Sequence, residues 1–193
     1  MAKQKSAKSG DKKSKGDVIN LFSAEHRKIK KLFREFENLS DINEDPKDQE
    51  RNSKKAKIVT QLCTELIIHA QAEEALFYPA VREAIAGHED IKEEELMDEI
   101  AIEQAGVRAY LGQLVRMSPS DSYYDARVRV LRKYTKQHAR ELKGKVFPMI
   151  KKTGLDIQGL GEQISKLKDE LKARKSPQRR PRKKLTLQKN NTS

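Results

Sequence analysis

Apolar residues recur every three or four positions along four long stretches of the chain. This spacing is typical of amphipathic helices, and no stretch alternates convincingly with the period of two that marks a half-buried strand. The predicted helices run from an N-cap at Asp17 to about Leu39, from between Pro46 and Ser53 to about Ala86, from about Ile91 to Met117, and from the Ser118–Asp121 loop to Lys152. Four such helices joined by short to moderate loops predict an all-α fold, an antiparallel up-down four-helix bundle over residues 17–152.

Two further features follow from the same pattern. Pro79 lies inside the second predicted helix, and we expect a kink near residues 75–79 because proline lacks the backbone N–H of a helix interior. After Thr153-Gly154, which is a typical helix stop, Asp156 is placed to cap another helix. The apolar positions of that helix are Ile157, Leu160, Ile164, Leu167 and Leu171. The sequence therefore predicts a short fifth helix within residues 153–171.

The basic residues are concentrated at the two ends of the chain. The net charge is +12. Residues 1–16 contribute +5 and residues 172–193 contribute +9, which leaves −2 on residues 17–171. Both ends are too polar to form a packed core, so we expect disordered basic tails. The C-terminal tail permits two interpretations, a solubilising segment or a segment that neutralises nucleic-acid phosphates.

Several classes of protein are not indicated. The single cysteine, Cys63, excludes an internal disulfide, and no apolar run approaches the ~20 residues that span a bilayer. No secretory signal is visible, so we expect a cytoplasmic protein without membrane contact. No phosphate-binding glycine loop, Ser/His/Asp arrangement or general acid/base pair is recognisable, so the pattern does not indicate an enzyme.

Three histidines occupy core-facing positions. His69 and His138 each begin the same pattern: His-Ala, seven residues, an aromatic residue and proline. Glu73 lies one helical turn after His69 on the same stripe, and His26 interrupts an apolar stripe of the first helix. His88 lies in a loop beside acidic residues, where a solvated position is expected. The sequence thus directs three imidazoles and one carboxylate into the bundle.

Imidazole and carboxylate groups are good ligands for iron, zinc, copper and manganese. Left unpaired, each buried group would cost roughly 1 to 3 kcal/mol. One shared cation would compensate all four, so His26, His69, Glu73 and His138 are the candidate metal ligands. The alternative is that each histidine bonds separately to a backbone carbonyl or a neighbouring carboxylate.

These residues and their neighbours resemble the hemerythrin-like family, also called HHE cation-binding domains. The similar segments are Glu25-His26, His69 to Glu74 leading to Phe77-Tyr78-Pro79, Glu103 to Val107, and His138 leading to Phe147-Pro148. The resemblance covers roughly residues 17–152 and places the four candidates at family ligand positions. It implies a bacterial four-helix bundle with a non-haem iron site, usually dinuclear, that binds dioxygen or nitric oxide or takes part in iron and redox handling.

The chain departs from the family pattern at two ligand positions. Leu142 stands where the family has a carboxylate four residues after the fourth-helix histidine. Gln104 stands where the third helix usually has histidine, and its place on the apolar stripe of that helix directs its amide toward the site. Three neighbouring carboxylates could substitute for the missing ligands, but each is one residue, or about 100° around its helix, from the expected ligand direction. They are Glu74, Glu103 and Glu141. Three states stay open: a mononuclear site, an incomplete di-iron site, and a metal-free relic that acts as an interaction protein through its basic tails. Iron is the metal that the resemblance implies, and zinc or another divalent metal is compatible with the ligands. An iron-dependent oxidase or peroxidase-like activity is a further alternative.

Overall fold

The computed structural model describes residues 16–40, 48–86 and 91–175 of the 193-residue chain. These residues form helices and turns, with no strand among them. The helices are α1 (Val18–Asn38), α2 (Gln49–Ala72), α3 (Tyr78–Ile85), α4 (Ile91–Leu114), α5 (Tyr124–Glu141), α6 (Phe147–Ile150) and α7 (Ile157–Lys175). Two π-helical turns, η1 (Glu73–Phe77) and η2 (Leu142–Val146), join α2 to α3 and α5 to α6. Each of these pairs therefore forms one long rod.

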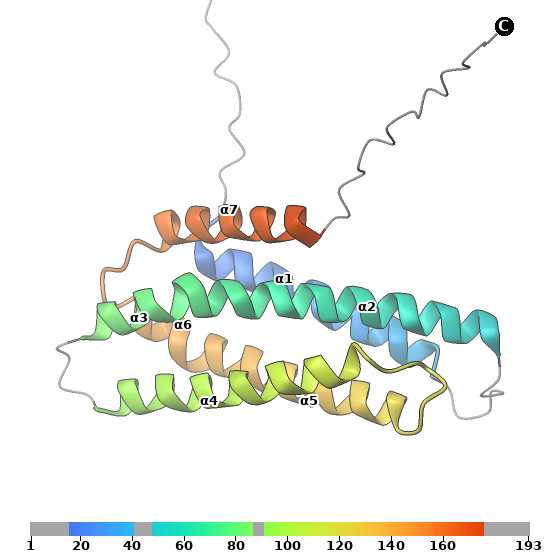
Figure 1. Ribbon diagram of the computed structural model, residues 1–193. Coiled ribbons are helices and arrows are strands. Elements are labelled where there is room, and N and C mark those ends of the chain that lie inside the picture. Colours follow the sequence, from blue (N-terminus) through green and yellow to red (C-terminus); the bar gives the residue numbers. More distant parts are fainter. Residues whose placement is uncertain (1–15, 41–47, 87–90, 176–193) are drawn as a thin grey trace, which may run out of the picture.

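Four rods lie side by side as a bundle: α1, α2–η1–α3, α4 and α5–η2–α6 (Figure 1). The predicted all-α bundle is confirmed. The helix α7 packs against α1, α2 and η1 on the outside of the bundle. Among the described residues, no helix is long and apolar enough to cross a membrane.

The helix ends agree with the sequence at some positions and differ at others. The Asp17 carboxylate accepts the backbone N–H of Asn20 at 2.8 Å, so Asp17 caps α1 as predicted. The fourth rod begins at Tyr124 instead of near Asp121, because Asp121 closes a turn by accepting the N–H of Ser118. The predicted fifth helix is present, but it has 19 residues and continues to Lys175, beyond the predicted end at residue 171. Residues 172–175, predicted to belong to the disordered basic tail, are instead the last residues of this helix, whereas residues 1–15, residues 176–193 and His88 lie outside the described residues.

The predicted kink at residues 75–79 takes the form of a π-helical turn over Glu73–Phe77. The N–H of Tyr78 bonds to the carbonyl of Glu73, five residues earlier, and Pro79 then occupies the first turn of α3. Proline has no N–H to bond to the carbonyl four residues back, and its ring would clash with that carbonyl in a regular helix, so the wider turn accommodates it. The same turn follows His138, where the Phe147 N–H bonds to the Leu142 carbonyl before Pro148. The repeated His-to-Pro pattern is thus a repeated π turn.

The bundle has two apolar clusters, one toward each end. The first includes Phe22, Phe77, Val81, Ile100 and Leu142. The second includes Ile29, Phe36, Leu62, Leu111 and Leu131. On every rod, one polar position lies between the residues of the first cluster and those of the second: His26, His69, Gln104 or His138. The fold therefore places a polar layer between two apolar layers.

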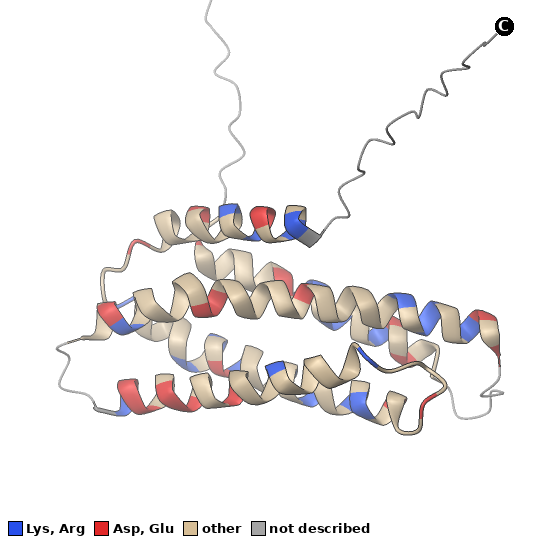
Figure 2. Cartoon of the chain, in the orientation of Figure 1, with Lys and Arg blue, Asp and Glu red and all other residues tan. Residues whose placement is uncertain are grey.

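Charged residues of both signs are spread over the helices (Figure 2). Cross-rod ion pairs include Lys28 with Glu65 at 2.6 Å and Lys55 with Asp125 at 2.7 Å. The second pair is largely buried at its lysine, which also lies over the Phe36 ring. These contacts link α1 to α2 and α2 to α5, and they involve none of the four residues of the polar layer.

Candidate metal centre

The four predicted ligands come together in the polar layer. His26 projects from α1, His69 from the end of α2, Glu73 from the start of η1 and His138 from α5. One ligand atom of each residue lies within 4.8 Å of those of the other three. Glu73 is fully buried, His69 is 4% exposed, and His26 and His138 are partly buried. The structure therefore brings together residues that are up to 112 positions apart in the sequence.

Three imidazole nitrogens and one carboxylate oxygen face a common point. The Nε2 atoms of His26 and His69 are 3.1 Å apart. Oε1 of Glu73 lies 3.1 Å from Nε2 of His69 and 3.2 Å from Nε2 of His138. Ligands held at about 2.0–2.1 Å around a tetrahedral ion are roughly 3.3 Å apart. The donor types and their separations therefore fit one small divalent cation.

The second oxygen of Glu73 has different partners. Oε2 accepts the side-chain amide of Gln104 at 2.6 Å and the hydroxyl of Tyr78 at 3.1 Å. The Gln104 amide nitrogen is also 2.9 Å from the Tyr78 oxygen and 3.5 Å from Nε2 of His138. Gln104 faces the site, as its place on the apolar stripe predicted. Two neutral donors thus engage the oxygen that would bridge to a second ion.

Within the described part of the chain, the region beside Glu73 Oε2 offers no further histidine or carboxylate. Leu142 begins η2 as Glu73 begins η1, and both Leu142 and Ile100 are buried in the first apolar cluster. Among the described residues, the metal-ligating cluster contains no other carboxylate. Glu74 pairs with Arg108, and Glu103 accepts the amide of Gln137 at 3.2 Å. The observed donors fit a mononuclear site and do not fit a complete di-iron site.

Glu25 and Lys168 are site residues that sequence reasoning missed. Oε2 of Glu25 lies 2.7 Å from Nδ1 of His69, the ring nitrogen that faces away from the cluster. Lys168, from α7, donates to the same oxygen, and its Nζ is 3.4 Å from Nδ1 of His69. A signal for Lys168 existed, since it follows Ile164 by one turn on the apolar stripe of α7. Nothing in the sequence indicated which helix that stripe covers.

The protonation of the cluster follows from burial and the two carboxylates. Burial, together with the charge of His69, lowers the pKa of His26 to about 3. Burial also opposes a charge on His69, but the negative charge of Glu73 and the hydrogen bond to Glu25 outweigh it and raise the pKa of His69 to about 9. Burial would raise the pKa of Glu73, but His69 and His138 hold it well below its usual range. Without a cation, the cluster therefore holds a proton on His69 between two carboxylates.

A small void adjoins the cluster on the side of α4 and α5. Its volume is about 20 Å³. Its polar lining consists of the three clustered histidines, Gln104, Thr135 and the ring of Tyr134, and its apolar lining is Leu66, Ala70, Val107 and Leu111. This void is large enough for a single very small molecule.

A groove of about 250 Å³ lies between α4 and α5 and leads toward the void. The groove and the void share Gln104, Val107, Tyr134 and His138 in their linings. Gly106 and the half-exposed Tyr134 line the groove nearer the surface. The groove therefore lies next to the void and the cluster.

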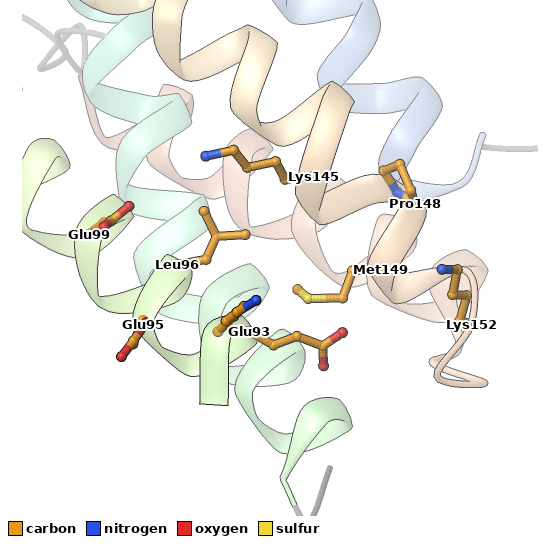
Figure 3. Close-up of a pocket in the computed structure, with 9 residues that line it drawn as sticks. Glu93, Glu95, Leu96, Glu99, Lys145, Pro148, Met149 and Lys152 are labelled. Carbon is orange, nitrogen blue, oxygen red and sulfur yellow. The ribbon is translucent and has the colours of Figure 1, made fainter. Parts of the chain in front are cut away.

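A larger pocket of about 430 Å³ lies elsewhere, between the start of α4 and α6 (Figure 3). Acidic residues of α4, including Glu95 and Glu99, line this pocket together with Lys145 and Lys152. None of the four clustered residues lines this pocket. It is an open surface pocket lined by residues of both charges, and this larger pocket is not the one that contains the candidate metal ligands.

Comparison with known proteins adds three findings. The model of the hemerythrin HHE cation binding domain matches residues 17–150. A protein of Nostoc sp. named DNA nickase is 30% identical over 142 residues, which are 74% of this chain and 36% of that protein. The crystal structure of an HHE cation-binding-domain protein from Mycobacterium kansasii is similar, with a TM-score of 0.60 and 22% identity.

The extents of these matches limit what each of them shows. The similarity to the Mycobacterium kansasii structure covers 82% of this chain and 89% of that one, and at this identity it shows the fold. The chain spans only about a third of the length of the nickase. The family match ends at residue 150, before α7 begins, so Lys168 lies outside it.

Proposed function

Because the chain belongs to the hemerythrin HHE cation-binding family, we propose that it holds a single iron ion through His26, His69, Glu73 and His138. A cation-binding helical protein is what the family match and the clustered ligands support directly. The convergence of three Nε2 atoms and Oε1 of Glu73 between two apolar layers is the observation that carries the proposal. Iron is inferred from the family, since the same ligands also suit zinc.

The proposal of one ion per chain is supported by the environment of Glu73. Its Oε2 accepts hydrogen bonds from Gln104 and Tyr78, and Leu142 and Ile100 are apolar where a second ion would need ligands. A carboxylate bridge to a second cation would require both neutral donors to move away. In the observed arrangement, Gln104 and Tyr78 stabilise the ionised carboxylate and orient its Oε1 toward the histidines.

We further propose that the site binds a small diatomic molecule such as dioxygen or nitric oxide, for sensing or carriage. An iron ion, when bound, supplies a centre to which such molecules add. The chain supplies the void of about 20 Å³ beside the ligands, in which a molecule of this size would contact Leu66, Val107 and Leu111 as well as the histidines. The α4–α5 groove supplies access from solvent.

Metal analysis after anaerobic reconstitution tests this function. We expect one iron per chain in the wild type, loss of that iron in His69→Ala, and retention in His88→Ala, which removes the chain's other histidine. Nitric oxide should change the visible spectrum of the two iron-containing proteins and leave His69→Ala unchanged. A folded wild type that takes up no iron would support the metal-free alternative. Oxygen or peroxide turnover that depends on bound iron would favour the oxidase alternative.

Nucleic-acid binding through the basic C-terminal segment is a second candidate function. Residues 172–193 carry nine cationic side chains and no acidic one, and the similar Nostoc protein is named a DNA nickase. The segment has no aromatic residue, so contact with phosphates is favoured over base stacking. Deletion of residues 176–193 should weaken retention on duplex DNA and flatten its dependence on salt. A matched deletion of residues 1–15 controls for general loss of charge, and unchanged retention after the C-terminal deletion would contradict this function.

A further inference from the structure

We propose that α7 is part of the metal centre, with Lys168 as a positioning residue that holds Glu25 against His69. The inference rests on the proposed metal site. Lys168 and Glu25 contact neither the common point of the four ligands nor the void. They act on the opposite edge of the His69 ring, and so they determine how its Nε2 is presented to an ion.

The contacts around Lys168 define its role. Its side chain is only 4% exposed, and it donates to Oε2 of Glu25, the same oxygen that lies 2.7 Å from Nδ1 of His69. Its ammonium group also lies 4.9 Å from the centre of the Phe22 ring, and that ring packs edge-on against His69 at 5.0 Å. Lys168 therefore contacts the groups that surround the back of the His69 imidazole.

Glu25 gains a defined position from this contact. A carboxylate that accepts Nδ1–H fixes the orientation of a histidine ring and leaves Nε2 as the metal-binding nitrogen. Glu25 is at the edge of the bundle, with 21% of its side chain exposed, so without Lys168 it can rotate toward water. The buried ammonium group favours the position in which Glu25 accepts from His69.

The helix that carries Lys168 is firmly docked. Leu160 and Ile164 of α7 are buried in the first apolar cluster. Gly161 lies against the start of α1, where an added Cβ would be 2.8 Å from the backbone nitrogen of Val18. This close approach fixes the position of α7 at Gly161, about two helical turns before Lys168. Docking of α7 and orientation of His69 are therefore coupled through a short chain of contacts.

The charge of Lys168 has a second effect of opposite sign, because an ammonium group near a divalent cation repels it. Glu25 lies between Lys168 and His69 and offsets that repulsion. Loss of a group that orients a metal-binding histidine typically weakens metal affinity about 10- to 100-fold. We therefore expect positioning to outweigh repulsion, so that removing Lys168 weakens the site.

Cobalt(II) affinity of the full chain, followed by visible absorption, tests the proposal. The proteins to compare are the wild type, Lys168→Met, Glu25→Gln, the double variant and Lys166→Met, which replaces an exposed lysine on the same helix. We expect Lys168→Met and Glu25→Gln each to weaken binding about tenfold. The double variant should bind no more weakly than Glu25→Gln, because Lys168 acts through Glu25. Lys166→Met should bind like the wild type.

A spectroscopic measurement separates positioning from a general loss of packing. In the zinc-loaded wild type, nitrogen NMR should show the Nδ1–H of His69 in a hydrogen bond, and this signal should shift in Lys168→Met. Glu25→Gln changes no residue of α7, so it tests the same contact if Lys168→Met does not fold.

Three outcomes would overturn the proposal. Cobalt affinity in Lys168→Met within twofold of the wild type, or tighter, would exclude a positioning role. Additive effects in the double variant would show that Lys168 and Glu25 act independently. A wild type that binds no cobalt would contradict the metal site itself, and with it this inference. If the wild type binds cobalt and Lys168→Met binds it equally well, only the inference is contradicted.

Discussion

The two oxygens of Glu73 lie in different surroundings. Oε1 is within 3.2 Å of two imidazole nitrogens, and Oε2 accepts from an amide and a phenol. A fully buried carboxylate is costly unless both oxygens are satisfied, and here each has two partners. Glu73 can therefore remain ionised inside the bundle, which is what a ligand for a cation requires.

Metal binding should depend on pH through His69. Its pKa is raised to about 9 by Glu73 and Glu25 against the opposing effect of burial, so at neutral pH an ion must displace a proton from it. We expect affinity for cobalt(II) to rise about tenfold per pH unit between pH 6 and 8 and to level off above about 9. Titrations with a competing chelator at several pH values measure this slope.

The sign of this effect follows from competition. Lower pH favours the protonated ring and opposes the ion, whereas higher pH removes the competitor. Proton release on metal addition, followed in weakly buffered solution, provides a second measurement, with His69→Ala as the control that should release none. An affinity that does not change between pH 6 and 8 would show that His69 is already neutral before the ion binds.

Among the elements, the π turns place the residues that follow the histidines. Each begins four residues after a histidine, so Glu73 and Leu142 occupy equivalent positions on two rods. The sequence predicted an irregularity around Pro79, and it showed the repeated motif. It could not show that the irregularity is a widened turn, because that depends on how the proline-containing turn packs against the neighbouring rods.

The groove between α4 and α5 predicts a kinetic effect. Gly106 lines this groove, and a Cβ added there meets nothing within 4 Å, so Gly106→Leu should narrow the entrance without moving the backbone. We expect slower nitric oxide association in stopped-flow measurements and unchanged metal content. Stability should not fall, because leucine is favoured over glycine in a helix interior by up to about 1 kcal/mol.

The matched control for this variant is Ala105→Leu, at an exposed neighbouring position of α4 that does not line the groove. It adds similar bulk on a different side of the helix and should leave the rate unchanged. Equal association rates in Gly106→Leu and the wild type would show that small molecules reach the cluster by another route.

For the whole molecule, the four candidate ligands come from three of the four rods, so a bound ion would link these three rods. A ligand that binds only the folded state stabilises it, by about 2.7 kcal/mol when its free concentration is 100 times its Kd. We expect chelation of the metal to lower the Tm of the wild type. Thermal unfolding of His69→Ala should be insensitive to chelator, and a wild type whose Tm does not respond to metal removal would contradict a structural contribution from the ion.

Periodicity and residue type were sufficient to predict the bundle, the cap at Asp17 and the convergence of His26, His69, Glu73 and His138. These are properties of single helices whose apolar faces must meet. The contacts of Lys168 with Glu25 and His69 could not be predicted, because they depend on where α7 lies on the bundle. The groups that support His69 from behind, Glu25 and Lys168, are therefore set by tertiary packing, whereas the four candidate ligands can be identified from the sequence pattern of single helices.

Helix α7 starts beyond the last residue of the family match, yet its lysine touches the surroundings of a candidate ligand. A protein truncated at that boundary would retain every ligand and lose one support of His69, so its affinity would understate that of the full chain. Relatives with identical ligands but unlike C-terminal segments would likewise differ in how strongly they retain an ion. The identity of the ligands alone would therefore not predict the relative metal affinities of such proteins.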